Sequence, residues 1–287
     1  MKFARDGGDV HTQLMRNSRV KFITSKVRIS DMTSFAIEGG EIAYSDQGSG
    51  DGVILVHGFA ASAAENWAKA GWIQMLVRAQ RRVVALDLRG HGLSTKFRQP
   101  SEYTLHAMAG DVLALVEQLQ IKKPDLIGFS LGARVVLELL RARGDRFLLG
   151  VLCGVGETLL NPPLERDPEA FAKAMEAPSP DAIVDDMARR FRMFAEGQGQ
   201  DLAALAACSR GLAAMGRPWT RELLAGIKNE MLVVAGTGDD LAGAPEPLAA
   251  AMGNAKSKRI PGCGHMDCLT QPMFKAAVMD FLAGYPA

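Results

Sequence analysis

A serine flanked by glycines stands near the middle of the chain, in the stretch IGFSLGA at residues 127–133. Gly128 and Gly132 lie two residues before and two residues after Ser130, between an apolar run and a helical pattern. A sharp strand-to-helix turn of this kind exposes the serine hydroxyl beside the free N–H groups of a helix N-terminus. Composition alone would produce such a motif roughly 0.14 times in this chain. Ser130 is therefore a candidate nucleophile that needs support from other residues.

A serine hydroxyl reacts efficiently only when a base removes its proton. His265 is the best candidate base, because it follows the last short predicted strand in a loop with glycines nearby. Two other histidines follow earlier strands, where we expect them to shape loops, and two lie in the N-terminal arm and on a helix. These four are His57, His91, His11 and His106.

A catalytic histidine needs a carboxylate that fixes its tautomer and stabilises the imidazolium. Asp239 and Asp240 follow the apolar run MLVVAG in a glycine-rich turn, and either suits this role. We favour Asp239, with Glu157 after the preceding strand as a distant alternative.

Apolar, β-branched runs alternate with helical patterns along most of the chain. This alternation predicts an α/β fold with a mostly parallel sheet and helices on both faces. The loops after the strands then form the expected site. A hairpin is predicted around Gly39–Gly40, and strands are predicted at 53–56, 82–87, 125–129, 148–154, 231–236 and 257–260. Thr104 is a candidate cap of the helix that begins after it.

About seventy residues interrupt this alternation. A structureless loop of that length is implausible inside a domain, so we expect residues 157–226 to form a small helical cap over the strand ends. The core then comprises residues 34–156 and 227–287. Residues 1–33 are basic with little apolar periodicity, and we interpret them as an N-terminal arm without a catalytic role.

Composition excludes several classes of function. The 33 basic and 32 acidic residues balance, so we expect no nucleic-acid partner and no anionic membrane. No apolar run reaches the roughly 20 residues of a membrane span. The four cysteines are scattered and predict no zinc site, which favours reduced thiols in a cytoplasmic protein.

Five segments together resemble the α/β-hydrolase fold, over residues 34–287. They are GFSLGA (128–133), HGF (57–59), DLRGHGLS (87–94), GTGD (236–239) and GCGH (262–265), in the family's order of serine, acid and histidine. The resemblance implies that Ser130 is the nucleophile, Asp239 the acid and His265 the base. It also implies an oxyanion hole from the backbone N–H groups of Phe59 and Leu131, without a metal or cofactor.

The resemblance implies a serine hydrolase that cleaves a small, largely apolar carboxylic ester or lactone through an acyl-enzyme. A serine at the elbow argues against epoxide hydrolases and haloalkane dehalogenases, which place an aspartate there. The same parts would serve a C–C bond hydrolase of ring-cleavage products, a perhydrolase of the haloperoxidase type, or a non-enzymatic small-molecule receptor. A C–C bond hydrolase would be expected to offer polar or cationic groups to a dienoate carboxylate. The candidates are Arg134, Arg189, Arg190 and Arg192, which helix-surface solvation explains equally well.

Overall fold

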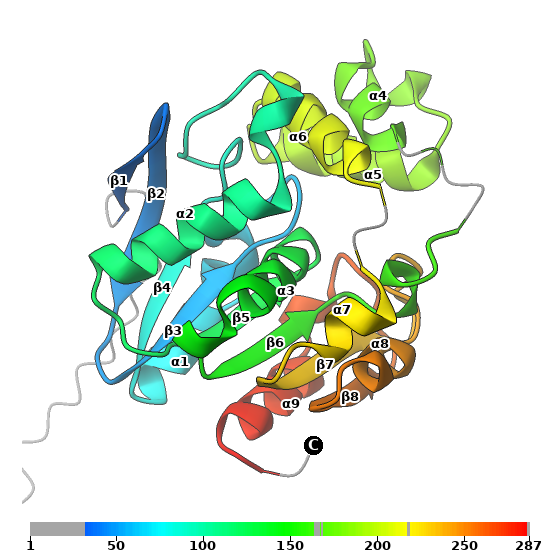
Figure 1. Ribbon diagram of the computed structural model, residues 1–287. Coiled ribbons are helices and arrows are strands. Elements are labelled where there is room, and N and C mark those ends of the chain that lie inside the picture. Colours follow the sequence, from blue (N-terminus) through cyan, green and yellow to red (C-terminus); the bar gives the residue numbers. More distant parts are fainter. Residues whose placement is uncertain (1–31, 164–166, 168, 217–218, 286–287) are drawn as a thin grey trace, which may run out of the picture.

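The computed structural model describes residues 32–163, 167, 169–216 and 219–285, and these residues form one eight-stranded sheet (Figure 1). Its order is β1-β2-β4-β3-β5-β6-β7-β8, antiparallel from β1 to β4 and parallel from there on. The sheet confirms the predicted α/β fold. The strands are β1 Thr33–Ile37, β2 Gly40–Gln47, β3 Asp51–Val56, β4 Arg81–Leu86, β5 Asp125–Phe129, β6 Leu149–Cys153, β7 Glu230–Gly236 and β8 Ala255–Ile260. Of the predicted arm, all but the last two residues lie outside the described residues, and Thr33 already pairs in β1.

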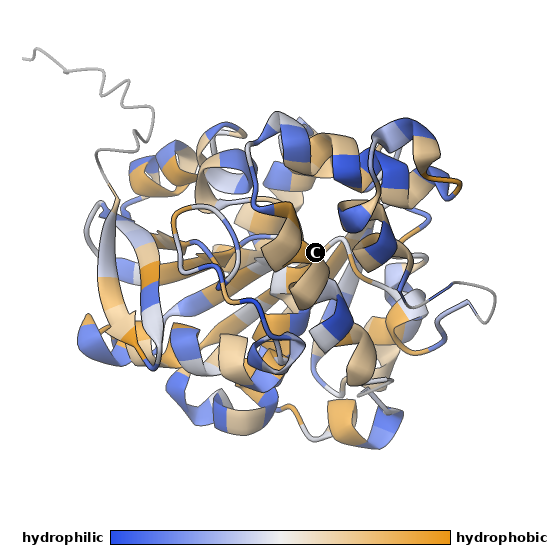
Figure 2. Ribbon diagram, turned by 90° about the horizontal axis from the view of Figure 1, so that it is seen from above, coloured by the Kyte–Doolittle hydropathy of each residue, from blue (hydrophilic) through white to orange (hydrophobic). Residues whose placement is uncertain are grey.

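The central strands are buried on both faces, as their continuous apolar runs predict. Successive side chains of a strand point to opposite faces. In β3, Val53 and Leu55 therefore join one apolar cluster, and Ile54 and Val56 join the other. Figure 2 shows strands lying between two layers of helices. The two clusters are the two halves of the core, one on each face of the sheet.

Six helical segments accompany the sheet in the core. Gly71, with a positive φ of 78°, lies between the first two of them and caps the start of the second. Thr104 caps the helix that begins at Leu105, as predicted, by accepting a hydrogen bond from the Ala107 N–H at 3.0 Å. The segments are a π-helical turn Ala64–Ala68, α1 Trp72–Arg78, α2 Leu105–Gln118, α3 Leu131–Arg143, α8 Pro245–Ala251 and α9 Pro272–Leu282. Short 3₁₀ turns occupy Pro100–Glu102, Gly144–Arg146, Glu157–Leu159, Pro180–Ala182 and Cys268–Thr270.

The described part of the segment between β6 and β7 contains four α-helices. Its first three helices are α4 Ala170–Glu176, α5 Asp186–Gly197 and α6 Leu202–Ala214, and we call them the insert helices. They lie above the C-terminal ends of the strands (Figure 1). The fourth, α7 Arg221–Ala225, lies beside α8 of the core. The exact limits of a cap at residues 157 and 226 stay a prediction.

The described residues contain neither a membrane-spanning helix nor a metal-binding cluster. No helix among them is long and apolar enough to cross a membrane. No group of three or more histidine, cysteine or acidic side chains among them is placed to hold a metal ion.

Candidate active site

Ser130 occupies a tight turn between β5 and α3. Its backbone lies at φ 53° and ψ −110°, a conformation that a residue with a side chain adopts only under strain. The turn closes because the two flanking glycines carry no side chain. A Cβ on Gly128 would overlap the carbonyl of Gly132, and a Cβ on Gly132 would overlap the carbonyl oxygen of Val56 in β3. The Ser130 N–H donates to the Cys153 carbonyl at 2.8 Å, which ties the turn to β6.

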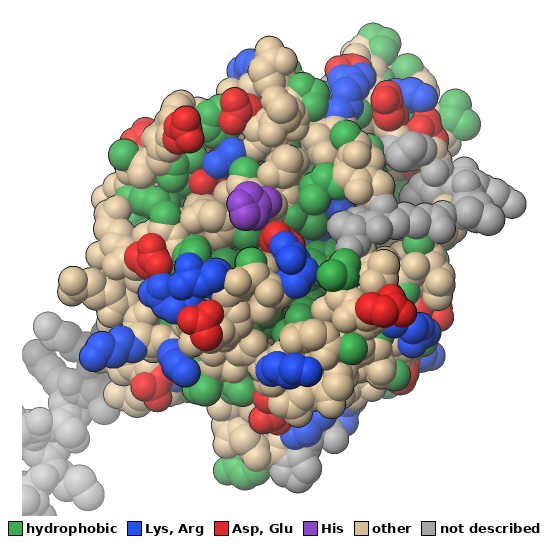
Figure 3. All heavy atoms as spheres, viewed as in Figure 1, with side chains coloured by type: hydrophobic (Ala, Val, Ile, Leu, Met, Phe, Trp, Pro, Cys, Tyr) green, Lys and Arg blue, Asp and Glu red, His purple; other side chains and the backbone are tan. Residues whose placement is uncertain are grey.

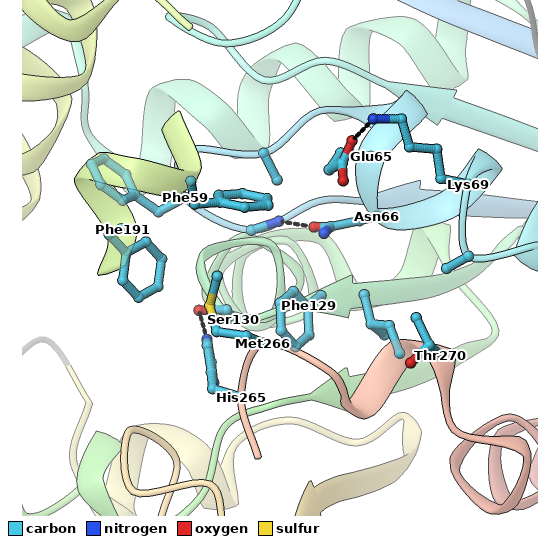
Figure 4. A pocket seen from close by; sticks show the side chains of 15 residues that line it. Phe59, Glu65, Asn66, Lys69, Phe129, Ser130, Phe191, His265, Met266 and Thr270 are labelled. Carbon is cyan, nitrogen blue, oxygen red and sulfur yellow. Dashed lines mark hydrogen bonds and ion pairs between the residues drawn. The ribbon is translucent and has the colours of Figure 1, made fainter. Parts of the chain in front are cut away.

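The structure brings Ser130, His265 and Asp239 together in one line of hydrogen bonds. His265 Nε2 lies 3.0 Å from Ser130 Oγ (Figure 4). On the other side of the ring, His265 Nδ1 lies 2.9 Å and 3.0 Å from the two carboxylate oxygens of Asp239. The Asp239 and His265 side chains are almost fully buried. Because the acid accepts from Nδ1, the Nε2 atom is left to accept a proton from the serine.

The two neighbouring aspartates differ in position, and Asp239, the one that we favoured, contacts His265. Asp239 is buried, and it also accepts a hydrogen bond from the Ala242 N–H at 3.0 Å. Asp240 is exposed. Glu157, the distant alternative, is exposed and accepts from the Ala244 N–H at 3.3 Å, away from His265.

The loop after β3 presents the Phe59 N–H, the first predicted oxyanion donor. Two contacts fix this loop on either side of Gly58. His57 Nε2 accepts from the Leu88 N–H at 2.9 Å, so the proton lies on Nδ1, which donates to the Gly58 carbonyl at 2.7 Å. The Gly58 N–H donates to Asn66 Oδ1 at 2.9 Å. His57 therefore shapes the loop, as its position after a strand predicts.

Within the described residues, the N–H groups of Phe59 and Leu131 donate to no other residue. Both residues line the same cavity as Ser130 and His265. Leu131 is the first residue of α3, where the N–H groups have no partner inside the helix. These two donors are therefore available to an oxyanion.

A buried pair of histidines packs against the loop after β3. The rings of His57 and His91 meet edge to face at 5.2 Å, and Phe59 packs against His91 at 5.8 Å. Burial lowers the pKa of His57 to about 4 and, with the neighbouring His57, lowers the pKa of His91 to about 3. Both rings are therefore neutral near pH 7 and act as packed hydrogen-bonding groups.

Two cavities meet at Ser130 and His265. One of about 160 Å³ is bounded by the loop after β3, by Phe129 and by the Glu65–Lys69 ion pair (Figure 4). The other, of about 610 Å³, lies between the core and the insert helices. Figure 3 shows hydrophobic side chains gathered between the upper helices and the core, while basic and acidic side chains alternate over the rest of that face.

Sequence reasoning gave no role to two residues of the site. Asn66 accepts a hydrogen bond from the Gly58 N–H in the loop after β3, and an asparagine at this place in the sequence gives no signal of that contact. Phe129 packs its ring against His265 at 4.9 Å, and only its place beside Ser130 in the elbow could have indicated it.

Known proteins share this fold. A family model described as "Alpha/beta hydrolase family" matches residues 53–276. Among solved structures, a hydrolase from Pseudomonas aeruginosa PA01 has a TM-score of 0.71 at 24% identity, covering 89% of this chain and 99% of that one. An enol-lactonase from Burkholderia xenovorans LB400 has a TM-score of 0.70 at 24% identity, covering 88% and 100%. A thermophilic esterase from Thermogutta terrifontis has a TM-score of 0.67 at 25% identity, covering 88% and 97%.

Curated sequences match over shorter stretches. A Synechocystis protein named "Putative non-heme chloroperoxidase" is 32% identical over 157 residues, which is 54% of each chain. An "Epoxide hydrolase" of Caballeronia sordidicola is 30% identical over 131 residues, 46% of this chain and 38% of that one. The chain thus spans about half, or less, of the length of these relatives. Since the family model covers most of the described sheet and all three residues of the hydrogen-bonded line, the chain belongs to the alpha/beta hydrolase family.

Proposed function

We propose that this hydrolase cleaves a carboxylic ester or lactone through a covalent acyl-enzyme on Ser130. The observation that carries the proposal is the contact of His265 Nε2 with Ser130 Oγ at 3.0 Å, backed by Asp239 on the opposite nitrogen at 2.9 Å. A serine is activated when a base of this geometry removes its proton.

Acylation follows from the geometry. His265 accepts the Ser130 proton while Oγ attacks the carbonyl carbon, and Asp239 stabilises the imidazolium. The charge that develops on the carbonyl oxygen is stabilised by the N–H groups of Phe59 and Leu131, which have no other acceptor among the described residues. His265 then donates its proton to the departing alcohol oxygen, and the acyl group stays on Ser130.

Deacylation repeats these steps with water. His265 removes a proton from a water molecule that attacks the acyl-enzyme, the same two N–H groups stabilise the oxyanion, and Ser130 regains its proton. For a lactone, the alcohol and the acid released are parts of one molecule.

The two cavities favour a substrate divided unequally about its carbonyl. The space of about 610 Å³ suits the larger part, and the space of about 160 Å³ suits a small group. The walls of both are mainly apolar, which supports apolar groups on both sides of the reacting carbonyl.

Several curated relatives are named epoxide hydrolases. The family members that open epoxides use an aspartate at the elbow, and this chain has Ser130 there. A hydroxyl nucleophile supported by His265 favours acyl transfer over epoxide opening.

We predict that Ser130→Ala lowers kcat for p-nitrophenyl butyrate by about 10³-fold or more, because the attacking atom is lost. The measurement is release of p-nitrophenol, with circular dichroism to confirm the fold. A fluorophosphonate probe should label the wild-type protein at Ser130, located by mass spectrometry of its peptides.

Ser101→Ala is the matched control, since Ser101 is exposed on the turn at 100–102, away from both cavities. Undiminished turnover by purified Ser130→Ala would refute the role of Ser130. A wild-type protein that releases one equivalent of product and then stops would favour a receptor with a slow triad over an esterase.

A further inference from the structure

Arg134 is a cation without a counter-ion among the described residues. It lies on α3 one helical turn after Ser130 and is partly buried, and its Nε is buried without a hydrogen-bond partner. Burial lowers the pKa of its guanidinium. Other arginines of α3 do have partners: Arg141 pairs with Glu138 at 2.7 Å and Arg143 with Asp145 at 3.7 Å. A partly buried charge without a partner is costly, so its retention calls for an explanation.

The other arginines that the sequence offered for a carboxylate are occupied or exposed. Arg189 is bonded to Asp186. Arg190 is exposed. Arg192 pairs with Glu196 at 2.8 Å and donates to three carbonyl groups at the end of α4. Among these four arginines, only Arg134 lines the large cavity.

The same cavity offers more free donors. Trp219, which is 4% exposed, has an Nε1–H group with no acceptor among the described residues. Ser209 of α6, also buried, adds a hydroxyl group to the wall. Buried N–H groups are almost always hydrogen-bonded, so the Trp219 N–H is a candidate donor to a group bound in the cavity that Trp219 lines. Besides His265, Arg134 is the one basic or acidic side chain of the described wall.

We propose that the substrate carries a carboxylate that binds Arg134 in the large cavity, with the Trp219 N–H as a further donor. This inference rests on the proposed ester or lactone hydrolysis, and it names the substrate class: half-esters of short dicarboxylic acids, or lactones bearing a carboxylate. A guanidinium binds a carboxylate through two parallel hydrogen bonds, which orients as well as attracts it.

The position of Arg134 supports this geometry. Its N–H donates to the Ser130 carbonyl at 3.2 Å, so the two residues lie about one helical turn apart, a rise of about 6 Å along the helix axis. Helical side chains lean toward the N-terminus of their helix, which here is the end occupied by Ser130. A carboxylate a few bonds from the reacting carbonyl would therefore reach Arg134 while the carbonyl lies at Ser130.

The test compares charged and neutral substrates of the same shape. Monomethyl malonate, succinate, glutarate and adipate are each assayed beside the methyl ester of the matching mono-amide, by methanol release. The proteins are the wild type, Arg134→Met, Arg134→Lys and the control Arg143→Met, whose residue lies on the same helix outside both cavities.

For the best chain length, the wild type should prefer the half-ester in kcat/KM by at least about tenfold. In Arg134→Met this preference should fall about 10- to 100-fold, mainly through a higher KM, because a remote contact binds substrate and transition state alike. Arg134→Lys should keep part of it, and Arg143→Met all of it. A wild-type preference for the amide esters, or equal preferences in Arg134→Met and Arg143→Met, would overturn the inference.

Binding without turnover separates this inference from the proposed function. Ser130→Ala protein is titrated with glutarate and adipate while tryptophan fluorescence is recorded, since Trp219 lines the cavity and the other tryptophans, Trp67 and Trp72, are buried in the core. We expect saturable quenching that Arg134→Met and Trp219→Phe abolish. Saturable binding in a wild type that neither hydrolyses esters nor reacts with fluorophosphonate would refute the esterase and keep the carboxylate site. Ester turnover without any saturable binding would refute the site alone.

Discussion

Asp239 and Asp240 are adjacent residues of the same type with different surroundings. Asp239 holds His265 Nδ1 between its two oxygens, while Asp240 is exposed at the surface of the turn. A buried carboxylate of this kind fixes the tautomer of the histidine and stabilises its charged form. The pair therefore provides a variant and its control one residue apart.

We predict that Asp239→Asn lowers kcat for p-nitrophenyl butyrate by about 10³- to 10⁴-fold, because an amide can favour the wrong tautomer and cannot stabilise the imidazolium. Asp240→Asn should stay within about twofold of the wild type. Steady-state kinetics of both purified variants provide the measurement. A larger loss in Asp240→Asn than in Asp239→Asn would assign the acid to the other residue.

The element that positions the nucleophile is the unit of β5, the turn and α3. It depends on close approach of backbones, because α3 starts directly beside the end of β3 and only a glycine fits at residue 132. A Cβ there would overlap the Val56 carbonyl oxygen, and β3 has neighbours on both sides in the sheet. The strand therefore has little freedom to move away.

We predict that Gly132→Ala lowers the free energy of unfolding by about 3 kcal/mol or more, since a side chain has to be accommodated in a packed core. Gly110→Ala on α2 is the control: no atom lies within 4 Å of its new Cβ, and alanine favours a helix over glycine by about 1 kcal/mol. Urea unfolding followed by circular dichroism measures both. Equal stability of Gly132→Ala and the wild type would show that the elbow tolerates a wider separation of α3 from β3.

Across the molecule, the sequence predicted the buried strands and the residues at their ends, which follow from local patterns. It did not predict the cavities, which depend on packing between segments far apart in the chain. The runs around Ile54, Ile127 and Val233 lie in buried strands because a strand covered on both faces must be apolar throughout. Ser130, Asp239 and His265 meet because β5, β7 and β8 are parallel and end at one edge of the sheet.

The cavities were beyond such patterns. Their size and lining depend on how the insert helices lie over the core, and no local spacing encodes that arrangement. Arg134 illustrates the limit. Its helical position was evident from the sequence, whereas the shared cavity with Trp219, 85 positions later by numbering, comes from tertiary structure alone. Charge without a partner can be recognised only once every neighbour is known.

The buried histidines make the stability of the whole molecule depend on pH. His57 and His91 are fully buried, with pKa values of about 4 and about 3, below the 6.5 of an unfolded histidine. At these two sites the unfolded chain therefore binds more protons than the folded protein from about pH 6.5 down to the folded pKa values of about 4 and about 3. The contribution of the two neutral histidines to the free energy of unfolding is present above about pH 6.5 and is lost as the pH decreases.

We predict that lowering the pH from 7 to 5 costs about 2 kcal/mol of unfolding free energy for each of these histidines. His91→Leu should remove about half of the loss that the two histidines cause together. This holds whatever the stability of the variant at pH 7. Asp87 and Lys96 are the charged groups that act on His91, and both remain in the variant. The difference between the wild type and the variant in how unfolding free energy changes with pH therefore reports on His91. His106→Leu is the control, because the His106 side chain is 85% exposed. Urea unfolding at several pH values gives the slope of unfolding free energy against pH for each protein. A slope in His91→Leu as steep as in the wild type and in His106→Leu would contradict a neutral, buried His91.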